Sequence, residues 1–576
     1  MQCFDAQRLV MLAELELAQP MLPDVKAEAL LENAYRAAMR CDDAIALTRI
    51  AALENKHSAM PNLAAGDILK TAYRSAMGKQ DAQALVDAAQ AAEPAWQALG
   101  PQGRTGVLLE ALTRIHQRSF EIAHAVMLTT GQGAMMAFQA GGPHAQDRAL
   151  EAIAVAWKAM ADVPAEAVWE KPQGKHAPAV LHKRFEIVGR GVALVIGCAT
   201  FPTWNTYPGL FAALATGNPV IVKPHPNAVL PAALTVSVLR DVLTEQGLDP
   251  NLVTLAVSDK PELTQALATH AAVASIDFTG GNAFGQWLQS NAPQARLYAE
   301  MAGVNLVVIE STDAYAGMLR NLALSLSLYS GQMCTTTQNL LVPAGGIETD
   351  QGHKSFEQVG ADLAAAIDQL LADPKVAFTV LGAIGSAQTV ERVEQAATVG
   401  RAVRASQKLT HPEYPQAEVR TPALRALDVA DAAIYERECF GPVSYLVAVP
   451  SAQAARELAE RSVRAHGAMT LGLYSTDAAF VDAVAASALR SRVALSINLT
   501  QGVFVNQSAS FSDYHATGGN PAANATYTSL AFVADRFVIV QRREHVAAPA
   551  ARRDDFFFES DLKPANGGDE SWRGLL

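Results

Sequence analysis

One cysteine follows a glycine-containing segment, and a glutamate precedes that cysteine by a few tens of residues in the sequence. Cys334 stands in the run Tyr329-Ser-Gly-Gln-Met-Cys334-Thr, and Glu300 lies 34 residues upstream (334 minus 300). A thiol that attacks a carbonyl carbon needs a flexible backbone that exposes its sulfur, a nearby base and donors for the oxyanion. The glycine before Cys334 and the carboxylate of Glu300 could supply the first two. The alternative is that Cys334 is a small buried hydrophobic residue, as most free cysteines are.

The composition narrows the classes of function. The chain has 576 residues, enough for two or three domains and a large core. Its net charge is -12, from 45 basic and 57 acidic residues, and it contains no long basic run. Nucleic-acid phosphates need clustered lysine and arginine, so we expect no nucleic-acid partner.

The cysteines indicate the compartment. The chain has five of them, widely spaced and odd in number, which is typical of reduced thiols in a cytoplasm. No Cys-x-x-Cys pair is present, so we expect no metal site. The first residues carry charges where a secretion signal needs an apolar run, and no apolar stretch reaches the ~18 residues of a membrane span. The sequence therefore predicts a cytoplasmic protein without a membrane partner.

The elements that must position Cys334 and Glu300 follow a clear order. Helical spacing of apolar residues predicts a helical extension over 1–80, and Ala-rich helices continue to about 119. Short apolar runs then alternate with helical segments; the expected strands are 192–197, 219–223, 253–257 and 275–279, and the expected helices are 208–216, 232–246 and 261–269. This alternation predicts a doubly wound, Rossmann-like α/β domain, with ligands at the carboxyl ends of its strands. A second α/β unit begins near Asn305 with the run 306–309 and holds Cys334.

Six motifs in order carry a family resemblance. From about residue 80 to residue 540 the chain resembles the aldehyde dehydrogenase superfamily, through Gly191-Val-Ala-Leu-Val-Ile-Gly197, Ala215-Thr-Gly-Asn-Pro-Val-Ile-Val-Lys-Pro224, Phe278-Thr-Gly-Gly281, Glu300-Met-Ala-Gly303, Gly331-Gln-Met-Cys334 and Glu438-Cys-Phe-Gly-Pro442. The resemblance implies that Cys334 is the nucleophile, which forms a thiohemiacetal and then a thioester. It also implies that Glu300 is the base that activates water for thioester hydrolysis. Because Glu300 stands in a mostly apolar stretch, we expect burial to raise its pKa.

The same resemblance assigns a cofactor site. Lys223 matches the lysine that holds the adenosine ribose, and Glu438 matches the glutamate that grips the nicotinamide ribose. Gly280 matches the glycine at the mouth of the nucleotide pocket, where the absence of a side chain lets a cofactor approach the backbone. Phe440, in the motif of Glu438, is expected to contact the cofactor as well.

The donor to the oxyanion is open between two residues. Similar enzymes place an asparagine shortly after the first strand, and an alignment without gaps puts Thr200 there. The run Trp204-Asn205-Thr-Tyr-Pro208 has the residue types of that motif, but it lies five residues later than the alignment requires. We favour Asn205, because its amide is the donor that the chemistry needs.

The run Pro224-His225-Pro226 bears on the cofactor and on the reaction. NAD-preferring relatives have a glutamate where this chain has Pro226, so no carboxylate binds the ribose 2′-hydroxyl or repels a 2′-phosphate. We therefore expect NADP to serve at least as well as NAD. The same run also resembles CoA-acylating aldehyde dehydrogenases, which is the first alternative function. Those enzymes lack the hydrolytic glutamate, whereas Glu300 is present here.

Two further stretches narrow the resemblance. The runs 197–205 and 510–524 look like those of divergent aldehyde dehydrogenases associated with bacterial phenylacetate catabolism. That resemblance implies a semialdehyde substrate formed by ring cleavage, either free or as a CoA thioester. A second alternative is a non-catalytic binding or structural protein on the same fold, because fold does not fix function.

Family resemblance also implies an assembly. A hairpin at about 168–187 and a strand at 537–541 are expected to pair across subunits, which predicts a homodimer or a dimer of dimers. The expected organisation is a helical extension (1–80), a nucleotide-binding domain with the hairpin (81–302), a catalytic domain (303–515) and a C-terminal strand and tail (516–576). The substrate tunnel is expected beside a helix over 322–330 and loops near Phe504 and Tyr514.

Overall fold

The computed structural model describes residues 81–546 except 259, 302, 413, 501, 505–514 and 528. The predicted helical extension, the tail from residue 547 and Tyr514 lie outside the described residues. Two compact units are present: one comprises the described residues up to Asp162 together with Ile187–Val538, and the other comprises Val163–Glu186 and the described residues from Ile539. Among the described residues, no helix is both long and apolar enough to cross a membrane.

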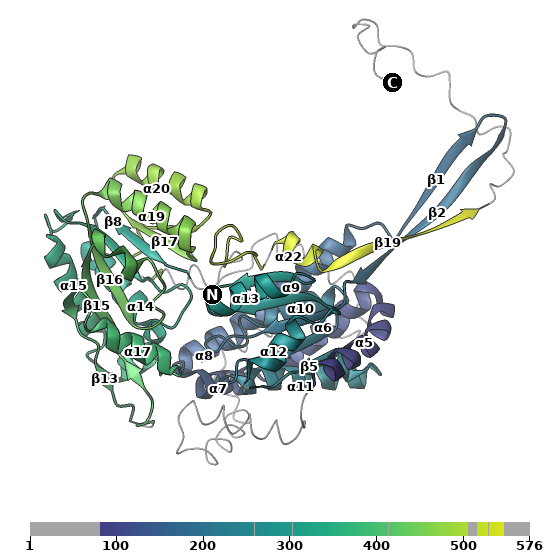
Figure 1. Cartoon of the computed structure of the whole chain (residues 1–576), viewed down its shortest axis with the longest axis horizontal. Helices are drawn as coiled ribbons and strands as arrows, with labels where there is room; N and C mark the ends of the chain where they lie inside the picture. The colour runs from purple at the N-terminus through teal and green to yellow at the C-terminus, as the bar shows by residue number, and fades with distance from the viewer. Residues whose placement is uncertain are drawn as a thin grey trace, which may run out of the picture. The chain divides into compact units, whose positions relative to one another are not determined.

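The described chain opens with the helices α5 (Ala82–Ala98), α6 (Gly100–Gln117), α7 (Ser119–Thr130), α8 (Ala134–Gly141) and α9 (Pro143–Ala161), which are labelled in Figure 1. The carboxylate of Asp81 accepts the backbone N–H of Ala84 and so begins α5, while left-handed Gly131 ends α7. Trp96 is buried, and its indole N–H donates to the Leu214 carbonyl at 2.9 Å. The predicted Ala-rich helices between residue 81 and about residue 119 are confirmed.

The first sheet is parallel, with the strand order β5-β4-β3-β6-β7. Its strands are β3 (Val192–Ile196), β4 (Val220–Lys223), β5 (Val253–Leu255), β6 (Val273–Thr279) and β7 (Arg296–Glu300), and its helices are α10 (Tyr207–Ala215), α11 (Val229–Glu245), α12 (Pro261–Ala268) and α13 (Asn282–Asn291), with a 3-10 turn η1 (Pro250–Leu252). The apolar runs of β3 and β4 are buried throughout, as parallel strands covered on both faces require. The predicted doubly wound α/β fold is confirmed. Strand β7, which ends on Glu300, was not among the predicted strands.

The second sheet has the order β12-β15-β16-β10-β8-β17-β18 and is parallel except for β12. Its strands are β8 (Leu306–Ile309), β10 (Asn339–Pro343), β12 (Arg401–Arg404), β15 (Ala423–Asp428), β16 (Val443–Val449), β17 (Thr470–Tyr474) and β18 (Ala494–Ile497). The helices of this unit are α14 (Tyr315–Ser327), α15 (Phe356–Leu370), α16 (Pro374–Val380), α17 (Ala387–Ala396), α18 (Ala432–Tyr435), α19 (Ala452–His466) and α20 (Ala478–Ser491). The later helix α22 (Leu530–Ala534) instead packs with α9 in the core of the first sheet. Short pieces complete the unit: β9 (Ser311–Thr312) with β11 (Glu348–Thr349), β13 (Lys408–Leu409) with β14 (Val419–Arg420), and the 3-10 turns η2 (Leu328–Gly331) and η3 (Val429–Asp431).

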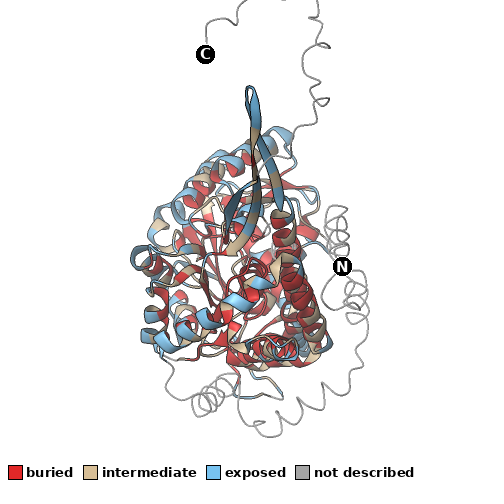
Figure 2. Cartoon of the chain, turned by 90° about the vertical axis from the view of Figure 1, so that its right-hand side faces the viewer, coloured by how far each residue is buried: buried red, intermediate tan, exposed pale blue. Residues whose placement is uncertain are grey.

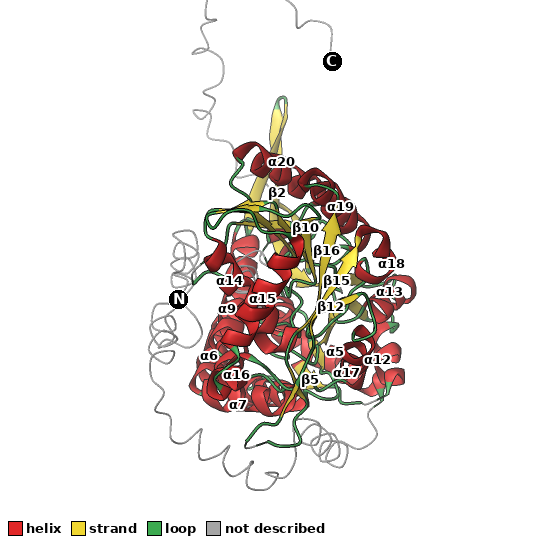
Figure 3. Ribbon diagram, turned by 90° about the vertical axis from the view of Figure 1, so that its left-hand side faces the viewer, coloured by secondary structure: helices red, strands yellow, loops and turns green. Residues whose placement is uncertain are grey.

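Strand alternation explains why helices cover both faces of this sheet. Along β8, Leu306 and Val308 pack in one apolar cluster with residues of α19 and α20, whereas Val307 and Ile309 pack in another with residues of α14 and α15. Successive strand side chains point to opposite faces, so an uninterrupted apolar strand needs helices on both. Figure 3 shows α15 and α19 with the strands of this sheet.

The expected hairpin is present as a sheet with the order β1-β2-β19, built from β1 (Glu166–Gln173), β2 (His176–Gly189) and β19 (Phe537–Val546). The strands β1 and β2 are antiparallel, with Glu166 opposite Arg184. Most of its side chains are exposed (Figure 2), including Val168 and Trp169. This sheet therefore has almost no core of its own.

Candidate active site

All seven residues that the sequence predicts for the site line one cavity of about 810 Å³. It opens where β3, β4, β6 and β7 end, which is where a doubly wound sheet binds ligands. The lining includes the predicted catalytic residues Cys334, Glu300 and Asn205 and the predicted cofactor residues Lys223, Gly280, Glu438 and Phe440.

Cys334 follows a tightly held turn. The helix expected over 322–330 is shorter than predicted: α14 ends at Ser327, and Tyr329, Ser330 and Gly331 have φ angles of 52°, 49° and 67°. The Ser330 hydroxyl lies 2.9 Å from the carbonyl oxygens of Gly382 and Arg420. Non-glycine residues with positive φ persist only where the surroundings hold them. The turn is thus fixed in shape rather than flexible, contrary to the sequence expectation.

Gly331 is the position in this turn where a side chain cannot fit. A Cβ atom there would lie 2.3 Å from the carbonyl oxygen of Gly441. Its positive φ also favours glycine. The turn before Cys334 therefore packs directly against the loop that carries Glu438 and Phe440.

Asn305 holds the chain on the other side of Cys334. Its amide nitrogen donates to the carbonyl oxygens of Cys334 and Thr336 at 2.7 and 2.9 Å. Its amide oxygen accepts the backbone N–H groups of Met469 and Thr470 at 2.9 and 3.1 Å. One side chain thus ties the nucleophile segment to the start of β17.

Glu300 ends β7 and is almost completely buried. Its Oε2 accepts from Tyr527 at 3.1 Å and from the Asn205 amide at 3.4 Å, and its Oε1 lies 3.3 Å from Nε2 of His515. Burial raises the pKa of this carboxyl, but the positive charge that His515 has when protonated, and hydrogen bonds from His515, Cys334 and Tyr527, together lower it below its ordinary value. The expectation of a raised pKa was wrong, because it considered burial alone.

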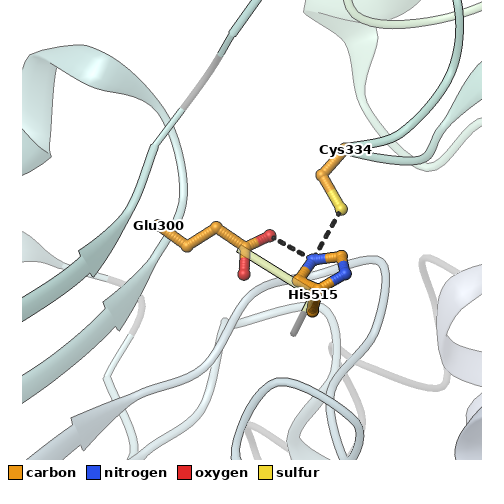
Figure 4. A group of neighbouring side chains, drawn as sticks. All are labelled: Glu300, Cys334 and His515. Atoms are coloured by element: carbon orange, nitrogen blue, oxygen red, sulfur yellow. Dashed lines mark hydrogen bonds and ion pairs between the residues drawn. The ribbon is translucent and has the colours of Figure 1, made fainter. Parts of the chain in front are cut away.

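The sulfur of Cys334 lies 3.5 Å from Nε2 of His515. Figure 4 shows the sulfur pointing towards the imidazole ring. Burial first, and then the charge and hydrogen bond of Glu300, raise the pKa of this thiol well above its ordinary value. The thiol therefore does not lose its proton readily to water. Attack on a carbonyl carbon from this position needs an acceptor for that proton close by.

Asn205 and Thr200, the two candidate donors to the oxyanion, have different surroundings. Asn205 is buried in the turn before α10, and its amide nitrogen reaches into the cavity beside Glu300. Its Oδ1 accepts the thiol of Cys198 at 3.4 Å, which orients the amide group. Thr200 also lines the cavity; its carbonyl accepts the side chain of Gln132 at 2.6 Å, and its hydroxyl lies 3.9 Å from the Cys198 sulfur. These contacts support Asn205 as the amide donor that faces the catalytic groups.

The far part of the cavity has features that fit a dinucleotide. Lys223 ends β4, and its ammonium donates to the carbonyl of Pro224 at 2.8 Å. Gly280 and Gly281 follow β6 and precede the ten-residue helix α13, whose free N–H groups are suited to a phosphate. The backbone N–H of Gly280 also donates to the Glu300 carbonyl at 3.1 Å, so this loop is joined to the strand of the base.

Glu438 and Phe440 lie between α18 and β16. Burial raises the pKa of Glu438 to about 7, against the opposing charge of Arg392. Arg392, on α17, donates to the Phe440 carbonyl at 3.0 Å. A carboxylate at this place can accept the two hydroxyls of a ribose once it is ionised.

Cys334, Glu300 and His515 have ligand atoms within 4.8 Å of one another, a spacing that a metal ion could bridge. We assign no metal, because a sulfur that coordinates a metal is not free to attack a carbonyl carbon. The expectation of a metal-free site stays a prediction.

Two residues beside the site were not predicted. His515 and Tyr527 contact Glu300 from a segment more than 200 residues later in the chain. His515 lies within the stretch 510–524 that carries the narrower resemblance, but no role was predicted for it. The histidine itself was the available signal, because histidine is the side chain that most readily accepts and donates protons near neutral pH.

Comparison with known proteins adds to this geometry. Residues 54–520 match the family described as "Aldehyde dehydrogenase family". A solved structure, the NAD-dependent aldehyde dehydrogenase from Burkholderia multivorans, is 53% identical, with a TM-score of 0.80 over 82% of this chain and 85% of that one.

Two curated relatives are more distant. Vanillin dehydrogenase of Pseudomonas fluorescens is 27% identical over 66% of this chain and 74% of its own length. N-succinylglutamate 5-semialdehyde dehydrogenase of Chromobacterium violaceum is 29% identical over 45% of this chain, and the match spans 51% of that relative.

Proposed function

Because the chain belongs to the aldehyde dehydrogenase family, we propose that it oxidises an aldehyde to the carboxylic acid through a thioester on Cys334. The observation that carries the proposal is the meeting of Cys334, Glu300 and Asn205 in one cavity, whose far part is lined by Lys223, Gly280 and Glu438. The same observation disfavours the non-catalytic alternative, since a structural protein has no need of this grouping.

Each residue has a step in the proposed reaction. The sulfur of Cys334 attacks the aldehyde carbon, and the amide of Asn205 donates to the oxygen that becomes negative. A bound nicotinamide cofactor supplies the acceptor for the hydride that leaves the same carbon. Glu300 then takes a proton from water, which attacks the thioester and releases the acid.

The test uses purified enzyme, an aldehyde panel and both cofactors. Reduced nicotinamide should form in proportion to acid. A panel that yields no reduced nicotinamide with a folded, cofactor-binding enzyme would contradict the proposal.

The CoA-acylating alternative is separated by its product. We propose hydrolysis, because Glu300 is present, buried and held by contacts with Asn205, His515 and Tyr527. Free acid should form without CoA, and Glu300→Gln should slow thioester hydrolysis by about 10²–10⁴-fold while a first turnover of reduced nicotinamide remains. Obligatory CoA with an acyl-CoA product, little affected by Glu300→Gln, would favour the alternative.

We propose NAD as a cofactor, supported by the similar Burkholderia multivorans enzyme, which is described as NAD-dependent. Pro226, which lines the cavity, leaves the 2′ position of the ribose without a carboxylate. NADP should therefore serve at least as well, and Pro226→Glu should shift the preference towards NAD. Specificity constants for both cofactors check this; a strong preference of the unmodified enzyme for NAD would show that another group compensates.

The substrate proposed is a semialdehyde from ring cleavage in aromatic, phenylacetate-type catabolism, either free or linked to CoA. Its support is the resemblance carried by residues 197–205 and 510–524. A panel of semialdehydes of graded length, each free and as the CoA thioester, tests it. Equal rates for all members would argue against a dedicated pathway role.

We propose a homodimer or dimer of dimers in the cytoplasm. The support is the three-stranded sheet, which exposes Val538, Ile539 and Val540 on β19 and has little core of its own. A sheet of this kind is marginal alone in water and is stabilised when another chain covers it. Light scattering should give a mass of two or four chains, and an active monomer at micromolar concentration would overturn the proposal.

A further inference from the structure

His515 has no part in the reaction as proposed above, although it touches both of the principal reacting groups. Its Nε2 lies 3.5 Å from the Cys334 sulfur and 3.3 Å from Oε1 of Glu300, and its side chain is fully buried. We propose that His515 is the base that takes the proton of the Cys334 thiol as the sulfur attacks the aldehyde. The proposal rests on the proposed function and adds a catalytic residue to it.

The hydrogen-bond partners of Glu300 support this direction of transfer. Oε2 accepts from both Tyr527 and Asn205, as an oxygen of an ionised carboxylate can. In the tautomer of His515 with its proton on Nδ1, Nε2 is an acceptor towards the Cys334 thiol, and its 3.3 Å contact with Oε1 becomes a hydrogen bond only when a proton reaches Nε2. A proton that arrives on Nε2 turns this contact into a charge-assisted hydrogen bond.

The transfer conserves charge within the buried site. The S–H bond breaks, its electron pair stays on sulfur and forms the C–S bond, and the proton forms an N–H bond on Nε2 of His515. The imidazolium then faces the carboxylate of Glu300, which stabilises it. Release of the proton to water instead would leave the new negative charge beside Glu300 without a cation, which is costly in a buried site.

The surroundings fix the ring of His515 in this position. The ring packs against Trp204 at 4.5 Å between centroids and an interplanar angle of 78°. The guanidinium of Arg148, on α9, covers the Trp204 ring at 4.2 Å. Among the described residues, the charged or titratable groups near His515 include Glu300 from β7 and Cys334 from its turn, with Arg148 and Tyr527 beyond Trp204 and Glu300.

Alkylation of Cys334 by iodoacetamide tests the proposal without an aldehyde. The reagent consumes the sulfur and releases the same proton, and peptide mass spectrometry follows Cys334 alone. His515→Gln keeps a hydrogen-bonding side chain that is not a base, so alkylation at pH 7 should fall by about tenfold or more. Tyr527→Phe is the matched control, because it removes a different partner of Glu300 and leaves His515 in place; it should fall much less.

Two further measurements separate a base from a space-filling side chain. In His515→Ala, added imidazole should restore part of the alkylation rate, because the removed ring leaves room for it. The unmodified enzyme should show a rate that levels off below the range in which ordinary thiols ionise, about pH 8–9. Equal rates at pH 7 for the unmodified enzyme and a folded, cofactor-binding His515→Gln variant would overturn the proposal, as would a profile that rises only through the ordinary thiol range.

The outcomes also distinguish this proposal from the proposed function. If the unmodified enzyme oxidises no aldehyde but His515→Gln slows alkylation of Cys334, the role of His515 as a base is supported and the proposed oxidation is refuted. If the unmodified enzyme oxidises aldehydes but Cys334 is alkylated equally fast with and without His515→Gln, the oxidation is supported and the role of His515 is refuted.

Discussion

Two cysteines line the same cavity, and their surroundings differ in the kind of group beside each sulfur. Burial raises the pKa of both thiols, to about 11 for Cys198 and well above the ordinary value for Cys334. Cys198 donates to the amide oxygen of Asn205, which cannot take its proton, whereas Cys334 faces the imidazole of His515. Burial alone therefore does not distinguish the two thiols; the imidazole beside Cys334 does, and on our proposal it is the base that makes this sulfur the nucleophile.

The sharpest test of this comparison removes each sulfur in turn. Cys334→Ala should lower aldehyde oxidation by at least about 10³-fold, because no group remains to form the thioester. Cofactor binding should persist. Cys198→Ser should slow the reaction by less than about threefold, since a hydroxyl can still donate to Asn205. Steady-state rates and a cofactor-binding titration measure both, and comparable losses in the two variants would contradict the comparison.

The two loops also differ in how they tolerate a methyl group. Gly331→Ala places a Cβ at 2.3 Å from a carbonyl oxygen at positive φ, so it should cost about 2 kcal/mol or more in stability and lower turnover at least about tenfold. Gly197→Ala, beside Cys198, meets the Thr206 hydroxyl at 2.9 Å, which belongs to a side chain rather than to the backbone. It should cost less than about 1 kcal/mol. Thermal unfolding and turnover check the order of the two effects, and the reverse order would refute this reading.

The cofactor end of the cavity should respond to pH through Glu438 and not through either thiol. Its pKa is raised to about 7 by burial, so the carboxylate that accepts the ribose hydroxyls is lost as the pH falls through 7. Cofactor affinity should rise with pH and level off above 7, with about tenfold weaker binding at pH 6 than at pH 8. Glu438→Gln should flatten this dependence. A cofactor KM that does not change between pH 6 and pH 8 in the unmodified enzyme would contradict the assignment.

The smallest expected effect is that of metal removal. Prolonged treatment with EDTA should leave aldehyde oxidation unchanged, because the reaction needs the sulfur of Cys334 free. Activity that is lost on chelation and regained with added metal would place a metal between Cys334, Glu300 and His515 and remove the basis for comparing the two thiols.

The elements with a periodic apolar pattern could be predicted from the sequence, whereas contacts between residues far apart in the chain could not. The strands β3, β4 and β6 are short apolar runs before turns, a pattern that a parallel sheet imposes, so their ends and the residues on them could be placed in advance. The strand β7 has a polar residue at each end, Arg296 and Glu300, and was overlooked for that reason.

The partners of the reacting groups follow a different rule. His515 meets Cys334 across 181 residues of chain, in a loop segment with no periodic pattern. The choice between Thr200 and Asn205 depended on the register of a loop, which apolar spacing does not specify. Long-range contacts made by loops are set by the assembled fold, so a single sequence gives the residue types but not their pairing.

The segment that carries Cys334 is anchored by a side chain that does not titrate. The side-chain amide of Asn305 makes four hydrogen bonds, two as donor and two as acceptor, and an amide neither gains nor loses a proton in the pH range of the tests. A change of pH within the range of the tests therefore does not alter the hydrogen-bonding capacity of the Asn305 amide. A change of Cys334 reactivity with pH thus reports proton movement among the reacting side chains, and the segment that carries the sulfur serves as a fixed reference for measuring it.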